Sequence, residues 1–489
     1  MTPGHETRVP PASEGHCDGF SRAQAIRRVL AGQPPVAREW DRRMPIPAGA
    51  GIDRRRFLAG AAGGLMTVYG AGRLGLTDRM LGDGIARAAA LQPVGSPILV
   101  SLFMQGGIDG LSLLAPVGDS LYEQLRPTLA VAPGAGIPVR EDPSLAWHPS
   151  ASSFATLHNA GRVTVLPSIG YTDPDMSHFT SRHYWEVGAT DASLLTGWMG
   201  RYLDVSGDAT NPFQGLSMDG QINPTLATTK NPTAAIDQPG NFAVYLNGVW
   251  GDAVEWALDS ASSLGDAQRD SRDRAIAQVA GAASEVGIVR RTLQPFRASN
   301  GGAGSSGTSA NPGAAYGSSV TYPTASTGDL PARLAGLAAM IAAGVPLRCV
   351  ALTTDTQFDT HSGQEATFDS GVKLVADSLA AFQADLEARG VDGRVLVHVW
   401  SEFGRRAQEN GSDGTDHGAA GVSLLIGSRV NSGMIGEFAP LSELDANGNQ
   451  RENVDFRGVY CSLLEQWFGQ DAADVIPGAG GFPRYQVLA

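Results

Sequence analysis

"RVLVHVWSEFGRRAQENGSDGTDHGAAGVSLLIGS" (Arg394–Ser428) contains two apolar runs separated by a polar, glycine-rich loop. The first run, Arg394–Glu402, is almost continuously apolar, and the second, Gly421–Ser428, repeats this pattern. Runs of this length and composition are typical of β-strands that are covered on both faces. The loop between them carries carboxylates, arginines and a histidine. The segment therefore predicts a buried sheet with a polar site at its edge.

Outward from this segment, the chain has further apolar runs that predict buried strands. They cover residues 97–105, 162–169 and 347–355. Helical patterns lie between the runs, over residues 152–161, 330–344 and 370–390. The last of these is amphipathic, as expected for a helix that packs on a sheet. Alternation of strands and helices predicts an α/β protein, with a three-layer α/β/α sandwich around a mostly parallel sheet.

We expect a single domain over residues 91–489, since no internal repeat is visible in the sequence. Residues 205–330 break the strand–helix alternation, and we interpret them as an insertion or cap beside the sheet. Within it, residues 253–296 have the pattern of one or two helices. Residues 299–328 are rich in Gly, Ser, Ala, Thr and Pro, which predicts a flexible surface loop.

The N-terminal region resembles a twin-arginine (Tat) signal peptide. Arg54–Leu58 has the sequence RRRFL, a Gly/Ala-rich apolar segment follows, and small residues at Ala88–Ala90 offer a cleavage site. We therefore expect residues 51–90 to be a Tat signal and the protein to be periplasmic or extracellular, with the Tat translocase as a partner during export. The alternative is a basic N-terminal helix of a cytoplasmic protein.

Two further features of the N-terminal region bear on the membrane and on the start of translation. Arg73 interrupts the apolar segment, so we expect no integral membrane span in the mature form. Residues 1–50 are rich in Pro and Arg and have little periodicity, which predicts a disordered extension or a mis-assigned start, with Met44 as the alternative start codon.

The composition is that of a folded, acidic protein. The 489 residues, 42% of them hydrophobic, are enough to bury a sizeable core. A net charge of -13 argues against nucleic acid as a partner, because phosphate binding needs basic patches. The cysteines Cys17, Cys349 and Cys461 have no metal-binding spacing. Cys349 and Cys461 lie in apolar runs, which favours buried thiols, with a disulfide between them as the alternative.

Polar residues follow the predicted strands at the points where ligands bind in open α/β sheets. They are Asp109 after the first strand, Ser177, His178 and His183 after the second, Asp355, Asp359 and His361 after the third, Glu402 after the fourth, and Asp416 and His417 before the fifth. Carboxylate oxygen and imidazole nitrogen are ligands of Zn, Mn, Fe or Ca. We therefore expect one or two divalent metal ions, of unknown identity, at this edge.

Each of these residues also has a purely structural interpretation. Asp359 has the position of a cap for the following segment, and Glu402 has a possible ion-pair partner in Arg405. His398 alternates with Glu402 along its strand, which suits a core histidine as well as a group that supports the site. The metal site is favoured because the residues occur together at successive strand ends.

Ser177, His178 and Arg405 are the candidate catalytic residues. A hydroxyl close to a metal ion is a nucleophile for phosphorus or sulfur, because the cation lowers its pKa. Arg405 or Arg182 would steady a substrate anion. The alternative role for Ser177 is that of a helix N-cap, and a helix N-terminus also favours bound anions.

The order of these motifs resembles a Tat-exported family called domain of unknown function 1501. The motifs are "IDGL", "DMSHFTSRHYWEVG", "FDTHSGQ", "SEFGR", "GTDHG", "TGWMGRYLD" (Thr196–Asp204) and "VDFRGVYCSLLEQWFG" (Val454–Gly469). That family is similar to the alkaline phosphatase and sulfatase superfamily, whose members hydrolyse phosphate or sulfate esters at sites with one or two metals. The resemblance covers residues 91–489 and implies an alkaline-phosphatase-like fold.

The resemblance also implies roles for single residues. Ser177 falls at the superfamily's nucleophile position, and "SEFG" aligns with "SDHG" of sulfatases. Phe403 stands where the superfamily has a histidine ligand, so one metal site needs a ligand from Asp416, His178 or His183. No Cys-x-Pro-x-Arg motif is present, which argues against a formylglycine sulfatase. The implied ligands are Asp109, Glu402 and Asp416 for one metal, and Asp359, His361 and His417 for another, with Asp355 as an alternative to Asp359.

Two functions follow from this reading. The first is an exported metal-dependent hydrolase that acts on a small anionic phosphate or sulfate ester through Ser177. The second is a non-catalytic metal-binding or interaction protein of the cell envelope that keeps the fold and binds an envelope protein. A cofactor-dependent oxidoreductase is disfavoured, because no GxGxxG follows a strand and no CxxCH is present.

Overall fold

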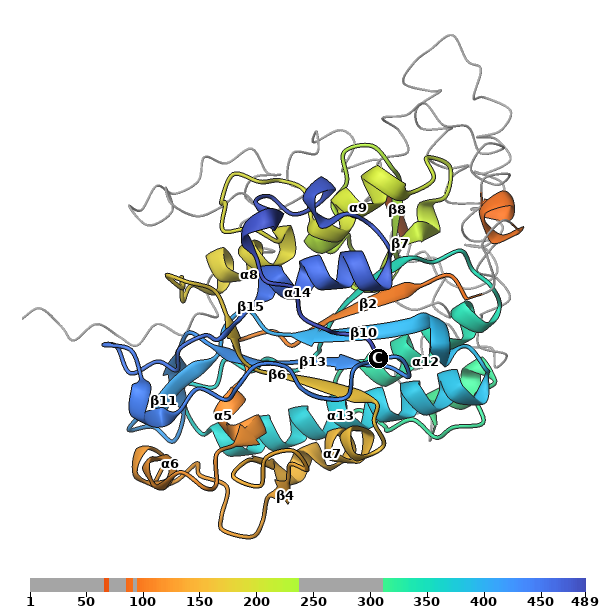
Figure 1. Ribbon diagram of the computed structural model, residues 1–489. Helices are drawn as coiled ribbons and strands as arrows, with labels where there is room; N and C mark the ends of the chain where they lie inside the picture. Colours follow the sequence, from red (N-terminus) through yellow and green to blue (C-terminus); the bar gives the residue numbers. More distant parts are fainter. Residues whose placement is uncertain (1–65, 70–84, 91–94, 237–310) are drawn as a thin grey trace, which may run out of the picture.

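A large mixed sheet forms the centre of the protein in the computed structural model, which describes residues 66–69, 85–90, 95–236 and 311–489 (Figure 1). Its strands are β1 (Met66–Tyr69), β8 (Thr233–Ile236), β7 (Gly215–Ser217), β9 (Cys349–Thr353), β2 (Ile98–Phe103), β10 (Val395–Trp400), β13 (Gly421–Ile426), β6 (Val163–Gly170) and β14 (Gly433–Met434), in that spatial order. A short β15 (Val454–Asp455) also pairs with β6.

The strands predicted from apolar runs are β2, β6, β9, β10 and β13, and they form the middle of this sheet. β2 runs parallel to β9 on one side and to β10 on the other. β13 runs antiparallel to both β10 and β6. The expected α/β class with a mostly parallel sheet is therefore confirmed, with β13 as an antiparallel strand inside it.

Helices cover both faces of the sheet, as expected for three layers (Figure 1). One face packs against α7 (Ser152–Asn159), α12 (Leu330–Ala342) and α13 (Gln364–Ala388), and the other against α8 (His178–Val187), α9 (Trp198–Ser206) and α14 (Phe456–Ser462). Alternate side chains of β2 serve the two cores: Val100 and Leu102 point to the first, Leu99 and Phe103 to the second. This two-residue alternation explains why the whole strand is apolar.

The first part of the predicted insertion, residues 205–330, contributes two strands to the sheet. β7 pairs in parallel with β9, and β8 pairs with β7, so the first part of that segment extends the sheet. These strands are only three and four residues long and contain Gly, Ala, Ser and Thr, so they give no long apolar run. The predicted helices over residues 253–296 lie outside the described residues, as does much of the predicted loop.

Most of the predicted leader also lies outside the described residues. Within it, β1 pairs antiparallel with β8 at the edge of the sheet. Ile85 is buried, and Arg87 donates a hydrogen bond of 3.1 Å to the Thr210 hydroxyl. No helix among the described residues is long and apolar enough to span a membrane. Cys349 and Cys461 are buried free thiols, so the alternative disulfide does not form.

Candidate metal centre

The carboxyl ends of the parallel strands bring the predicted residues to one edge of the sheet. β9 leads to Asp359, β10 leads to Glu402, and β6 leads through a loop to His178 at the start of α8. β13 runs the other way, so His417, which precedes it, returns to the same edge. The topology therefore explains why residues far apart in sequence meet here.

Helix α8 is fixed against the sheet by aromatic stacking. The Trp185 ring stacks on Trp400 at 5.4 Å between centroids and on Phe456 at 4.5 Å. The Ser181 hydroxyl donates a hydrogen bond to the Glu402 carbonyl. These contacts hold the first turn of α8, and with it His178, at the edge of the sheet.

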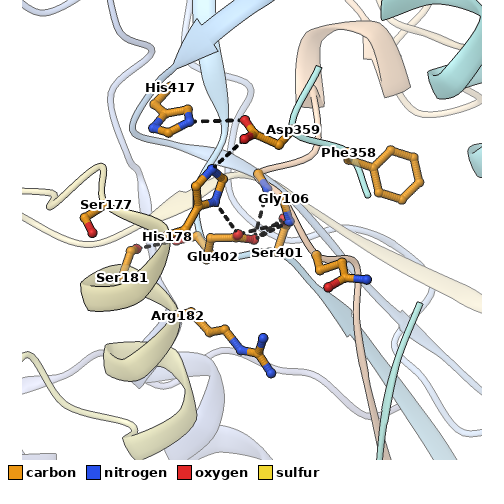
Figure 2. A network of polar contacts seen from close by, with 12 residues as sticks. Gly106, Ser177, His178, Ser181, Arg182, Phe358, Asp359, Ser401, Glu402 and His417 are labelled. Carbon is orange, nitrogen blue, oxygen red and sulfur yellow. Dashed lines mark hydrogen bonds and ion pairs between the residues drawn. The ribbon is translucent and has the colours of Figure 1, made fainter. Parts of the chain in front are cut away.

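Three side chains converge at this edge, namely His178, Asp359 and His417 (Figure 2). His361 lies beside Asp359 and His417. The Asp359 carboxylate lies 3.3 Å from His178 Nε2, 3.0 Å from His361 Nε2 and 3.2 Å from His417 Nε2. The Nε2 atoms of His361 and His417 are 3.0 Å apart. Ligand atoms about 2.0–2.1 Å from one zinc ion are separated by about 2.9–3.4 Å. The ligand atoms of His178, Asp359 and His417 all lie within 4.8 Å of one another, which suits a single small cation, and His361 lies at the edge of this group.

The outer nitrogen of each imidazole faces an acceptor. His417 Nδ1 lies 2.8 Å from the Met176 carbonyl oxygen, and His361 Nδ1 lies 3.3 Å from Asp416 Oδ1. His178 Nδ1 lies 2.7 Å from Glu402 Oε1. An imidazole whose Nδ1–H donates outward presents the Nε2 lone pair inward, which is the orientation of metal-bound histidines.

Among the described residues, Arg405 donates to Asp359 Oδ1, and no donor is seen for the three Nε2 atoms other than the cluster itself. When His361 and His417 are both neutral, their Nε2 lone pairs confront one another and the ionised Asp359 carboxylate. His178 Nε2 is buried and has no hydrogen-bond partner, although Asp359 lies within ion-pair distance. Protons on the imidazoles or a bound cation would remove the repulsion between these lone pairs. Three imidazoles and one carboxylate are ligands that a divalent transition metal prefers.

The cluster is open to solvent on one side. The side chain of His361 is 43% exposed, whereas those of His178, Asp359 and His417 are between 13% and 20% exposed. Structural metal sites are closed by four protein ligands, and catalytic sites keep a position for water or substrate. Access through the His361 side is a property that a catalytic site requires.

The pKa values of the cluster residues determine whether protons or a metal cation occupy their ligand atoms. Burial alone raises the pKa of Asp359, but its contacts with the histidines outweigh burial and hold the pKa far below its usual value. Burial also opposes the charged form of His178, yet contacts with Asp359 and Glu402 raise its pKa to about 9. Burial lowers the pKa of His417, so its lone pair is available at neutral pH.

Asp109 belongs to a different network. Its carboxylate accepts hydrogen bonds from Arg126 at 2.5 and 2.9 Å, from the Ser112 hydroxyl and from Gln364. Burial raises the pKa of Asp109, but Arg126 outweighs it and holds the pKa below its usual value. The structure thus does not place Asp109 with Glu402 and Asp416 as ligands of one ion, because an internal cation already balances its charge.

Glu402 and Asp416 also differ from the expected ligand roles. Glu402 is buried and accepts hydrogen bonds from the Gly106 and Gly107 amides and from His178. The side chain of Asp416 is half exposed and lies behind His361, on its Nδ1 side. Among the six predicted ligands, Asp359, His361 and His417 are the ones brought into direct contact, and His178 joins them.

The candidate catalytic residues are placed unequally. Arg405 is fully buried and binds Asp359 Oδ1 at 2.7 Å as well as backbone carbonyls, so it does not reach a substrate. Ser177 occupies the N-cap position of α8, but its side chain makes no capping bond. Its hydroxyl has no polar contact with the cluster in Figure 2. The predicted N-cap position of Ser177 is confirmed, although without a capping hydrogen bond, and the nucleophile role stays a prediction.

Phe403 takes part in the site without being a ligand. Its ring lies 4.8 Å from the His178 ring and 4.7 Å from the His417 ring, between centroids. It therefore packs against two of the imidazoles and limits their rotation. Where the resemblance implied a lost histidine ligand, the structure offers His178.

The sequence model of a family described as "Protein of unknown function (DUF1501)" matches residues 278–458. This range includes Asp359, His361, Glu402 and His417 but not His178, and it covers less than half of the chain. The family resemblance is supported over these residues. No curated protein matches the sequence.

The chain is also similar to several solved structures. One is the C-terminal periplasmic domain of EptC from Escherichia coli (9% identity, TM-score 0.31, 78% of this chain and 87% of that chain). Another is the lipoteichoic acid synthase LtaP from Listeria monocytogenes (6% identity, TM-score 0.30, 82% and 80%). A third is Ps i-CgsB in complex with k-i-k-neocarrahexaose (9% identity, TM-score 0.32, 80% and 75%).

Sequence patterns missed several residues that shape this site. Arg126 lies outside every motif named in the sequence analysis. A buried carboxylate such as Asp109 is stable only with a positively charged partner, but the sequence does not show which residue provides it. The Met176 carbonyl is a backbone group and leaves no sequence signal. The pair Gly106-Gly107 directly after a strand was a signal that two adjacent backbone amides approach a side chain closely.

Proposed function

We propose that this protein is an exported, metal-dependent hydrolase of anionic esters, with phosphate or sulfate esters as the substrate class. His178, Asp359, His361 and His417 would hold one divalent ion, with zinc, manganese or iron favoured by the three imidazoles. The observation that carries the proposal is the convergence of three Nε2 atoms on one carboxylate, with two of these nitrogens 3.0 Å apart.

The ion would supply Lewis acidity, which polarises an ester oxygen and lowers the pKa of a nearby hydroxyl or water. The residues of the chain would do the rest. Asp359 and His417 present their ligand atoms without needing to lose a proton at neutral pH. Exposed His361 marks the side from which a substrate enters. Ser177, with its unbonded hydroxyl at the start of α8, is the proposed nucleophile.

The first experiment is elemental analysis of the full chain purified without chelator. We expect one equivalent of a transition metal, and loss of that metal in Asp359→Asn and in His417→Ala. A folded protein that stays metal-free after zinc is offered would contradict the proposal. Ser177→Ala should keep the metal and lose at least 100-fold in the hydrolysis of phosphate or sulfate esters, and unchanged hydrolysis would remove Ser177 from the mechanism.

A second candidate function is a non-catalytic metal-binding protein of the cell envelope. It is favoured by the two arginines expected to bind a substrate anion: Arg405 is buried and binds Asp359 and backbone carbonyls, and Arg182 pairs with Glu186 at 2.8 Å. A metal-loaded protein that hydrolyses neither ester class would support this alternative. Export is tested separately, because replacement of Arg54 and Arg55 by lysine should retain the protein in the cytoplasm if the Tat leader is functional.

A further inference from the structure

The side chains of Glu402 and Arg405 form hydrogen bonds with the backbone of the dipeptide Gly106-Gly107 from two sides. Glu402 accepts hydrogen bonds from the Gly106 amide at 3.0 Å and from the Gly107 amide at 2.9 Å. Arg405 donates to the carbonyl oxygens of the same two glycines. One side chain thus binds the amides of the dipeptide and the other binds its carbonyls, and the two together fix both peptide planes.

These hydrogen bonds need both glycines. Gly106 has φ of +105° and Gly107 has φ of +65°, which L-residues adopt only with strain. A Cβ at Gly106 would lie 2.5 Å from the Asp359 backbone nitrogen, and a Cβ at Gly107 would lie 2.2 Å from the Phe403 ring. Two successive amides that point to one side form an anion-binding concavity, and here the anion is the Glu402 carboxylate.

Glu402 and Arg405 each also touch one member of the metal cluster. Glu402 Oε1 lies 2.7 Å from His178 Nδ1, on the opposite side of the ring from Asp359 (Figure 2). Arg405 Nη2 lies 2.7 Å from Asp359 Oδ1. Because an ionised carboxylate only accepts hydrogen bonds, His178 must donate through Nδ1, and its Nε2 is then the atom that faces the ion.

We propose that Glu402 is a positioning residue rather than a metal ligand: held by the Gly106 and Gly107 amides, it keeps His178 in the Nδ1–H form with Nε2 turned to the ion. This inference deepens the proposed function and depends on it, since it concerns the same ion. The Glu402 oxygens are already occupied by donors from Gly106, Gly107 and His178, and the Ser401 hydroxyl lies 3.0 Å from Oε2. Buried at 2% exposure, Glu402 has no open side for a cation.

The test is a double-mutant cycle on zinc affinity with the full chain. Glu402→Gln should weaken Zn²⁺ binding by roughly 10- to 100-fold, the usual effect of losing an outer-sphere partner of a ligand. In a His178→Gln background the same change should have little further effect, because Glu402 acts through His178. Equal losses in both backgrounds, or no loss in a folded Glu402→Gln protein, would overturn the proposal.

Glu409→Gln is the matched control. Glu409 accepts hydrogen bonds from the Thr128 and Leu129 amides, as Glu402 does from two glycines, but no histidine contact is recorded for it among the described residues. Its substitution should leave zinc affinity within threefold of the wild-type value. A loss as large as that of Glu402→Gln would mean that any carboxylate bound to backbone amides has this effect, and the proposal would fall.

A measurement on the wild-type chain keeps the proposal testable if Glu402→Gln does not fold. Nitrogen-15 NMR of histidine-labelled, zinc-loaded protein should show His178 protonated at Nδ1 and bound through Nε2. The reverse assignment would refute the role of Glu402. If zinc does not bind at all, the proposed function fails, whereas a proton on His178 Nδ1 hydrogen-bonded to Glu402 would still be visible in the metal-free protein and would leave the contact itself established.

Discussion

Asp109 and Asp359 follow two adjacent strands of one sheet, β2 and β9, and their charges are balanced in different ways. Asp109 is completely buried and paired with the Arg126 guanidinium, which supplies two hydrogen bonds. Asp359 also meets a guanidinium, that of Arg405, but three imidazoles surround its remaining lone pairs and one of them is exposed. The two aspartates lie at the same edge of the sheet. The carboxylate of Asp109 is neutralised by an arginine, whereas the carboxylate of Asp359 keeps lone pairs that can bind a cation.

The difference teaches that a carboxylate at a strand end is not enough to predict a ligand. What decides is how much of the carboxylate the neighbouring arginine takes up: Arg126 donates to both oxygens of Asp109, whereas Arg405 donates to Oδ1 of Asp359 alone. Arginine stays protonated at all physiological pH values, whereas imidazoles can give up their protons to a metal. Asp109 has thereby lost the capacity to bind an ion, and Asp359 has kept it.

The largest expected effect breaks the closed network. Arg126→Met should lower the free energy of unfolding by about 3–5 kcal/mol, because it leaves the Asp109 charge buried without a partner. Urea unfolding of the metal-free protein measures this. Adding Asp109→Leu should recover a large part of the loss, and zinc affinity should not change. A loss below about 1 kcal/mol would show that Asp109 is not balanced by Arg126.

A smaller effect concerns a buried histidine that meets no carboxylate. His398 lies in the core, its Nε2 faces the Ser423 hydroxyl, and its Nδ1 has no hydrogen-bond partner within the described part of the chain. Burial lowers the pKa of His398 to about 3, in contrast to His178. Since the folded pKa lies below the unfolded value of about 6.5, this group contributes no instability above pH 6.5, and stability is lost as the pH falls from there toward 3.

We therefore expect the wild-type protein to lose about 1.4 kcal/mol per pH unit more than His398→Leu over this range. Chemical unfolding at pH 7, 6 and 5 measures the difference. Identical pH dependence in the two proteins would show that His398 is protonated in the folded state.

The smallest expected effect tests the exposed side of the open cluster. Asp416 is half exposed and 3.3 Å from His361 Nδ1, so water weakens its contribution. Asp416→Asn retains an oxygen that accepts from His361, and zinc affinity should fall less than tenfold. Zinc titration with a competing chelator measures this. Complete loss of metal would make Asp416 a ligand itself, as the family resemblance implied.

The sequence was informative about the centre of the sheet. Runs such as Val395–Trp400 and Gly421–Ile426 are buried on both faces, so nearly every position is apolar and the pattern is unmistakable. The short strands Gly215–Ser217 and Thr233–Ile236 gave no such signal, because strand pairing, and not their own side chains, places them in the sheet. Helix α13 starts at Gln364, six residues before the predicted amphipathic segment, since its first turn is polar.

The chain by itself determined which chemical groups are available, and that they gather at one edge. A polar residue directly after a buried strand must lie near that strand's carboxyl end, and parallel strands share this edge. Only the tertiary structure decided how these groups are paired. Arg126 reaches Asp109, Arg405 and Glu402 hold a glycine dipeptide, and His178 turns toward Asp359 because of contacts between segments up to about three hundred residues apart. Charge balance in a protein interior depends on distances of a few ångströms, and sequence spacing does not fix those distances.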